Sequence, residues 1–212
     1  MWTVGPCSWK ASPPSSALVT RNSIDPNSIA AELLSVLSVY ALGMASEAAL
    51  ESELINRVTW KIPNALALVG SRAGDERNAM TTSWITQLSM EPVLIGVGVD
   101  NTAVTHRLIS DGGSFTINLW DSEDTRVFVK FSKPARDDGD ALNGRAVRPS
   151  RTGAPIFTEA IAWMDCEVRH AIDLGTHTLF VGELVDAAIA DDAKRSASMD
   201  DTRMKYGGVR RH

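Results

Sequence analysis

Short runs with the pattern of β-strands recur along this chain, and turn residues separate them. Six such runs lie between residues 65 and 189: Ala65–Ser71, Asn78–Trp84, Val93–Val99, Ser114–Trp120, Ala160–His170 and Thr178–Ile189. Helical patterns are few. Closing a sheet into a barrel removes its exposed edges. The sequence therefore predicts a mainly β fold, a closed β-barrel with a few flanking helices.

The turns between these runs suggest how neighbouring strands pair. Polar residues 72–76 separate the first two runs, which predicts a hairpin. The run Val93–Val99 is almost wholly apolar, which is typical of a strand covered on both faces. Residues 132–155 are rich in Gly, Pro and Asp. They are expected to form a long excursion rather than a core element.

Two segments show apolar residues at helical spacing. The first extends from Ser46, which can cap a helix, to Pro63, which ends the pattern. The second is Thr102–Ser110, and Gly112-Gly113 breaks it. Both helices are expected to flank the sheet.

Residues 1–43 differ in composition from the rest of the chain. Residues 11–28 are rich in Ser, Pro and Asn and predict irregular or disordered chain, whereas residues 29–42 could form a short apolar helix. Since the composition changes at Gly43, we hypothesise that Met44 is the natural start. Residues 1–43 would then be a poorly ordered or artefactual extension, and residues 44–212 the folded domain. The alternative is an amphipathic segment that touches a membrane or a partner.

The charge balance and the cysteine pattern exclude several classes of protein. Lys plus Arg number 21 and Asp plus Glu 26, for a net charge of −5, which argues against binding to nucleic acid or an anionic membrane. The two cysteines, Cys7 and Cys166, lie far apart, so neither a disulfide scaffold nor a zinc finger is indicated. No apolar stretch is long enough to span a membrane and no secretory signal is evident. A soluble, cytoplasmic protein is expected.

Several familiar catalytic motifs are absent from the sequence. There is no GxGxxG after a strand, no GxxxxGK[ST] loop and no GxSxG elbow. None of the four histidines forms an i, i+4 pair, which argues against zinc catalysis. Any enzymatic activity would therefore draw its reactivity from an organic cofactor.

Two segments could bind such a cofactor. Thr81, Thr82 and Ser83 place three hydroxyls in a row, which together with backbone N–H groups can bind a phosphate or ring carbonyls. The simpler alternative is that threonine is a good strand former. Asn101–Arg107 leads into a helix start that favours an anion, and Thr105, His106 and Arg107 could donate to a phosphate there, Arg107 as a bidentate clamp. The alternative is a capped surface helix with solvated side chains.

Five segments, taken in their order and spacing, resemble the flavin reductase-like family over about residues 58–190. They are Asn78–Trp84, Leu88–Pro92, Asn101–Ile109, Gly113–Asn118 and Gly175–Glu183. The resemblance implies an FMN-binding split β-barrel that forms a homodimer with flavin at the subunit interface. It also implies a set of cofactor-binding residues: Ala79, Met80, Thr81, Thr82, Ser83, Trp84, Ser89, Asn101, Thr105, His106 and Arg107.

The resemblance also singles out one catalytic histidine. In the family a Gly-Asp-His stretch places a histidine near the flavin and the nicotinamide, and this chain has Gly175-Thr176-His177. Thr176 replaces the acidic neighbour, so tuning of the imidazole pKa by a carboxylate is not implied here. The alternative is a histidine hydrogen-bonded at the rim of the barrel. Tyr206-Gly207-Gly208 is similar to a C-terminal stretch of some relatives.

The implied activity is transfer of hydride from NAD(P)H to FMN, or to FAD, and of electrons onward to a monooxygenase or another acceptor. His177 would donate a proton or orient the nicotinamide amide. Three alternatives stay open at this point: a non-enzymatic FMN-binding electron-transfer module, a flavin-free structural barrel, and a pyridoxamine-phosphate-oxidase-like split barrel, which usually has more Arg and Lys around the phosphate.

Overall fold

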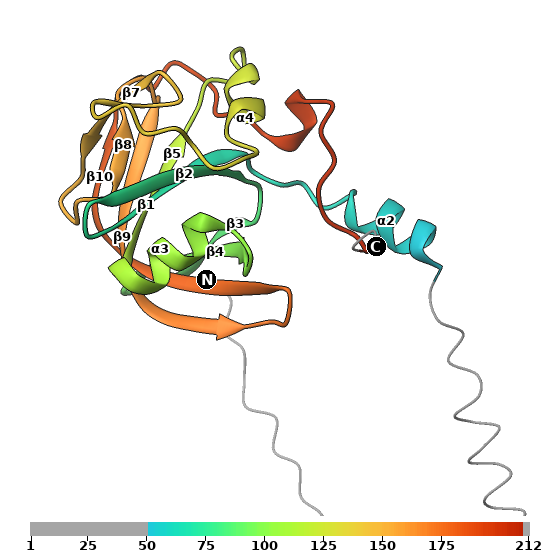
Figure 1. Ribbon diagram of the computed structural model, residues 1–212. Helices are drawn as coiled ribbons and strands as arrows, with labels where there is room; N and C mark the ends of the chain where they lie inside the picture. Colours follow the sequence, from blue (N-terminus) through green and yellow to red (C-terminus); the bar gives the residue numbers. More distant parts are fainter. Residues whose placement is uncertain (1–50, 210–212) are drawn as a thin grey trace, which may run out of the picture. The chain divides into compact units, whose positions relative to one another are not determined.

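The computed structural model describes residues 51–209 (Figure 1). The expectations for residues 1–43, for Met44 and for a cap at Ser46 lie outside these residues. In the described part, no helix has the length and apolar character that crossing a bilayer would require. The described residues form one compact unit.

A seven-stranded antiparallel sheet is the main element of this unit (Figure 1). Its strand order is β2-β1-β5-β9-β10-β4-β3. The strands are β1 (Ala67–Ala73), β2 (Glu76–Thr82), β3 (Ile85–Met90), β4 (Val93–Asp100), β5 (Ser114–Leu119), β9 (Ala162–Asp173) and β10 (His177–Ile189). All six strand-like runs of the sequence are present, and β1 and β2 form the predicted hairpin. The fold is therefore mainly β, as predicted.

The sheet is rolled but not closed. Strands β2 and β3 form its two edges, yet only Ser83 and Trp84 separate them along the chain, so the two edges must come close together. The backbone N–H of Gly98 in β4 donates to the carbonyl of Trp84, which holds this corner against the sheet. Full closure was thus a wrong expectation. The barrel is split where the chain turns from β2 into β3.

The helices lie outside the sheet. Helix α3 (Val104–Gly112) packs against β1 and β2, and Gly113 ends it in the left-handed conformation (φ 68°), as the predicted glycine break requires. Helix α2 (Ser52–Thr59) begins after Glu51 and buries none of its side chains. The short helix α4 (Arg126–Lys130) follows β5 and buries Val127 and Phe128.

The segment expected to be a long excursion contains structure of its own. Strands β6 (Ala141–Leu142), β7 (Arg145–Pro149) and β8 (Pro155–Phe157) form a second, three-stranded sheet. Pro155 and Phe157 are buried, so the second sheet contributes to the core. The glycines and prolines were expected to mark an excursion without core structure. In the structure Pro155 begins strand β8.

Two apolar clusters form the core. One fills the rolled sheet with side chains from β1, β4, β5, β9 and β10, and it includes Cys166, which is fully buried. Burial raises the pKa of the Cys166 thiol to about 12, so this cysteine acts as a small core residue. The other cluster lies among β1, α4 and the second sheet, and its large members are aromatic: Trp120, Phe128, Phe131 and Phe157.

Candidate functional site

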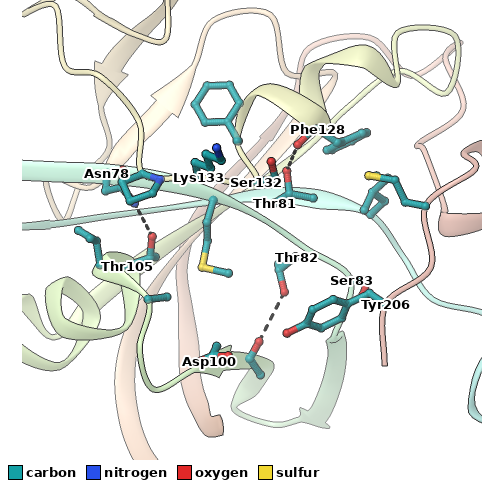
Figure 2. Close-up of a pocket in the computed structure, with 18 of the residues that line it drawn as sticks. Asn78, Thr81, Thr82, Ser83, Asp100, Thr105, Phe128, Ser132, Lys133 and Tyr206 are labelled. Carbon is teal, nitrogen blue, oxygen red and sulfur yellow. Dashed lines mark hydrogen bonds between the residues drawn. The ribbon is translucent and has the colours of Figure 1, made fainter. Parts of the chain in front are cut away.

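A cavity of about 590 Å³ lies between β2, the end of β4 and the start of α3 (Figure 2). This volume is in the range of pockets that hold small molecules and cofactors. Its wall comes from β2, the start of α3, the segment after α4 and the C-terminal segment. Lining residues with polar side chains include Asn78, Thr81, Thr82, Ser83, Asp100, Thr102, Thr105, Ser132, Lys133, Lys205 and Tyr206.

The three hydroxyls at the end of β2 differ in their surroundings. Thr81 Oγ1 donates to the carbonyl of Phe128 at 2.7 Å, which fastens β2 to α4. Thr82 Oγ1 makes a long contact of 3.5 Å to the carbonyl of Gly98. Ser83 is 3% exposed, and its Oγ has no hydrogen-bond partner among the described residues. A buried hydroxyl without a partner is costly, so Ser83 is suited to a ligand that brings one.

The start of α3 forms another part of the wall. Residues 102–105 line the cavity, and no described side chain caps the helix at Ala103. The Nδ2 of Asn78 in β2 donates to Thr105 Oγ1 at 2.8 Å, which ties the first turn of the helix to the strand. A helix start presents N–H groups and the positive end of its dipole, which together favour an anion.

Two lysines, Lys133 and Lys205, line the cavity, whereas Arg107 does not. The guanidinium of Arg107 lies 2.5 Å from Glu76 and 3.9 Å from Asp111, and its side chain is half exposed. His106 Nε2 is 2.8 Å from Thr178 Oγ1, a hydroxyl that also donates to Asn101 Oδ1. Asn101 and His106 thus contact Thr178 in β10, and Arg107 pairs with acidic side chains at the surface. None of these three residues lines the cavity.

The segment that carries Lys133 is held in place by an ion pair. Arg77 in β2 donates through two nitrogens to Asp137, each at 2.8 Å, and also contacts the carbonyl of Gly139. This hydrogen-bonded guanidinium holds the pKa of Asp137 down at about 2. In addition, Asn78 Oδ1 accepts from the N–H of Ala135 at 2.7 Å. Lys133 therefore lies on a wall that is fixed to β2.

His177, at the start of β10, lies in an aromatic cluster with Trp84 and Tyr206. Its ring centroid is 4.6 Å from that of Trp84. Its Nδ1 is 2.9 Å from Thr176 Oγ1, and its Nε2 is 2.8 Å from the hydroxyl of Tyr206. Both ring nitrogens are therefore held by hydroxyl groups.

The predicted site residues are thus only partly brought together. Met80, Thr81, Thr82, Ser83 and Thr105 line the cavity, and Trp84 lies beside it against Tyr206. The side chain of Ala79 belongs to the buried core, and Ser89 lies in the edge strand β3.

Sequence reasoning missed Asn78, Lys133, Lys205 and Tyr206 as lining residues. Asn78 was inside a singled-out segment and could have been found there. Tyr206 was also in a stretch that resembles the C-terminus of some relatives, whereas the two lysines reach the cavity only through the folding of distant loops, which no local pattern reveals.

Comparisons with known proteins identify the family of this chain. Residues 59–208 match the model of the flavin reductase like domain. A ferric-chelate reductase (NAD(P)H) of Archaeoglobus fulgidus is 30% identical over 150 residues, which cover 70% of this chain and 89% of that protein.

Solved structures give the same result. BorF, the flavin reductase component of a bacterial two-component tryptophan halogenase, is 29% identical with a TM-score of 0.59, over 69% of this chain and 98% of that one. An FMN-binding protein from Thermus thermophilus is 25% identical with a TM-score of 0.55, over 63% and 77%. The predicted split-barrel fold and oxidoreductase class are confirmed. The chain belongs to the flavin reductase-like family.

Proposed function

We propose that this protein is an NAD(P)H-dependent flavin reductase that binds FMN in the cavity between β2 and α3. The observation that carries the proposal is Ser83, a buried hydroxyl on the cavity wall without a partner among the described residues. A flavin ring offers carbonyl and nitrogen acceptors that such a hydroxyl can satisfy. The residues present therefore fit the group.

The phosphate of FMN would lie at the start of α3. The free N–H groups of its first turn and the ammonium of Lys133 would supply positive potential there. The similarity to an FMN-binding protein favours FMN over FAD. FMN is also the smaller of the two flavins, which suits a single cavity of about 590 Å³.

The remaining residues of the site orient the reactants. When bound, the flavin accepts hydride from NAD(P)H and passes electrons to a further acceptor. Hydroxyl and backbone donors from Thr82 and Ser83 would stabilise negative charge on a reduced ring. Trp84 supplies a flat face beside His177, whose imidazole would orient the nicotinamide amide or donate a proton. Correct orientation of two reactants alone can lower a barrier by about 7–11 kcal/mol in favourable cases.

Two kinds of acceptor fit the relatives. One is a partner monooxygenase or halogenase that receives reduced flavin, as the name of BorF indicates for that protein. The other is a ferric chelate, as the name of the Archaeoglobus fulgidus protein indicates. We favour release of reduced flavin to a partner enzyme, because part of the cavity wall is the C-terminal segment, where Lys205 and Tyr206 are exposed. A cytoplasmic location follows from the proposed donor.

We further propose a homodimer that buries the outer face of β3. This edge strand exposes two large apolar side chains, with Leu88 47% and Met90 86% exposed. Exposed apolar groups on an edge strand are typical of a surface covered by another chain.

The second candidate is a non-enzymatic FMN-binding module. The similarity to the Thermus thermophilus protein, which is named only for FMN binding, favours it. The test is direct: the purified protein is titrated with FMN, and oxidation of NADH and of NADPH is followed at 340 nm. FMN binding with turnover supports the reductase, binding without turnover supports the module, and no binding refutes both.

A further inference from the structure

Tyr206 lies at the end of the cavity where the nicotinamide is expected. Its hydroxyl is 2.8 Å from His177 Nε2, and its ring centroid is 5.1 Å from that of Trp84. Figure 2 shows Tyr206 on the same side of the cavity as Thr82 and Asp100, across from Lys133. The phenol thus occupies contacts with His177 and Trp84 that a flat, hydrogen-bonding ligand would otherwise make.

The C-terminal segment, residues 199–209, carries Tyr206 and is held at its two ends. At one end Arg195 and Asp201 form an ion pair of 2.6 Å, and the N–H of Met199 donates to Asn64. At the other end Trp60 Nε1 donates to the carbonyl of Gly207 at 3.3 Å, and Asn56 Oδ1 accepts from the N–H of Val209 at 2.8 Å.

The chain around Tyr206 has features of a segment that can move. It forms no helix or strand, and Tyr206 itself is 48% exposed. Gly207 and Gly208 follow with φ of 101° and 88°, conformations that glycine adopts readily and that it can also leave. A segment with few buried contacts opens locally at low cost in free energy.

We propose that Tyr206 holds the nicotinamide subsite and is displaced when the dinucleotide binds. This inference rests on the proposed function. A nicotinamide ring is flat and carries a carboxamide, so it can replace the phenol both beside Trp84 and as the hydrogen-bond partner of His177. Because the binding-competent state requires Tyr206 to leave, the apparent affinity for the dinucleotide equals the intrinsic affinity multiplied by the fraction of protein in which the segment is open.

The test measures binding of NAD⁺ and NADP⁺ by calorimetry to the FMN-loaded protein, together with KM for NADH and NADPH. Tyr206→Ala is expected to tighten dinucleotide binding about tenfold, since it removes one hydrogen bond and the ring contact. Tyr206→Phe keeps the ring but removes the hydroxyl, and it is expected to tighten dinucleotide binding about threefold. FMN affinity should change little in both variants.

A variant outside the cavity separates displacement from direct contact. Trp60→Phe removes the indole donor to Gly207 but leaves Tyr206 intact, and we expect it to shift dinucleotide affinity in the same direction, about twofold. Val209→Ala keeps the backbone hydrogen bond to Asn56 and serves as the matched control with unchanged affinity. Hydrogen exchange of residues 203–209 should speed up when NAD⁺ or NADP⁺ saturates the wild type.

The outcomes are distinct from those of the proposed function. If FMN binds and NAD(P)H is oxidised, yet Tyr206→Ala leaves or weakens dinucleotide affinity and exchange of residues 203–209 does not speed up, the displacement of Tyr206 is refuted alone. If FMN does not bind the wild type, the proposed function fails first, and the inference fails with it.

Discussion

Ser83 and Thr81 are close in sequence, yet their hydroxyls have opposite roles in the free protein. Thr81 already donates to Phe128, whereas Ser83 is buried without a partner among the described residues. We therefore expect Ser83→Ala to leave the free energy of unfolding unchanged or slightly higher, because it removes an unsatisfied group. FMN binding should weaken by about 0.5–1.5 kcal/mol, as measured by fluorescence quenching.

Thr81→Ala provides the matched comparison. It should lower the free energy of unfolding by about 1 kcal/mol in urea denaturation, because it removes the side-chain hydrogen bond that joins β2 to α4, and it should change FMN affinity less. Equal loss of FMN affinity in both variants would show that Ser83 has no special part in the site.

At this scale the sequence shows the row of hydroxyls, all three of which line the cavity, but it could not rank its members. Three consecutive hydroxyls on a strand are visible in the sequence, whereas the partner of each depends on what packs opposite. Thr81 meets Phe128, which is far along the chain, and His177 meets Tyr206, near the C-terminus. Such long-range contacts, unlike spacing along one strand, leave no local pattern.

The start of α3 is the element that we expect to bind the phosphate, and two cations near it can be compared. Lys133 lines the cavity, whereas Arg107 pairs with Glu76 on the outer side of the helix. Lys133→Ala should weaken FMN binding by about 1–3 kcal/mol and reduce its salt dependence. Riboflavin, which lacks the phosphate, should be affected much less.

Arg107→Ala is the matched control for that experiment. It removes an equal charge from the same helix region, and it should change FMN affinity by less than about 0.5 kcal/mol because exposed ion pairs contribute little. A larger effect of Arg107→Ala than of Lys133→Ala would restore the phosphate role that the sequence predicts for Arg107.

The ion pair between Arg77 and Asp137 joins β2 to the segment that carries Lys133, and it should make stability depend on pH. The folded-state pKa of Asp137 is about 2, below the usual value near 3.9 in an unfolded chain. The unfolded state therefore takes up the proton first as pH falls. The stabilisation is complete above about pH 4 and is lost as pH falls towards 2.

Asp137→Asn removes this titration while keeping the shape of the side chain. At pH 6 the variant should be less stable than the wild type by about 1 kcal/mol, a figure reduced for solvent screening because the pair is partly exposed. The difference should shrink between pH 4 and pH 2 in urea denaturation. A difference that stays constant over this range would contradict the assigned role.

Strands with apolar or β-branched residues packed in the core were predictable from the sequence, and strands without them were not. Strands β1, β4, β5, β9 and β10 follow runs seen in the sequence, since each has a face packed in the core. Strand β3 carries mostly polar or exposed residues and was missed. Strands β6, β7 and β8 are short, and their pairing depends on Gly and Pro turns that locally resemble loop.

The split of the barrel appears only at the level of the whole molecule. The strand-like runs predicted a sheet that removes its edges, and the sheet does bring β2 and β3 together at Ser83 and Trp84. Whether the two edges then pair depends on what lies between them. Here a cavity lies beside that corner, and Ser83 is on its wall. No feature of one strand contains that information.

One edge of the split barrel, β3, is the surface through which we expect two copies to associate. Met90→Glu places a charge where an 86% exposed apolar side chain would be buried by a partner, and like charges would face each other across a two-fold interface. We expect the wild type to elute as a dimer and the variant as a folded monomer in size-exclusion chromatography with light scattering.

Val129→Glu is the matched control, because Val129 is also exposed (63%) but lies on α4, away from β3. It should leave the dimer intact. If flavin lies at the subunit interface, as the family resemblance implies, Met90→Glu should also weaken FMN binding, whereas Val129→Glu should not. A wild type that is monomeric at micromolar concentration, or a Met90→Glu variant that stays dimeric, would exclude β3 as the interface.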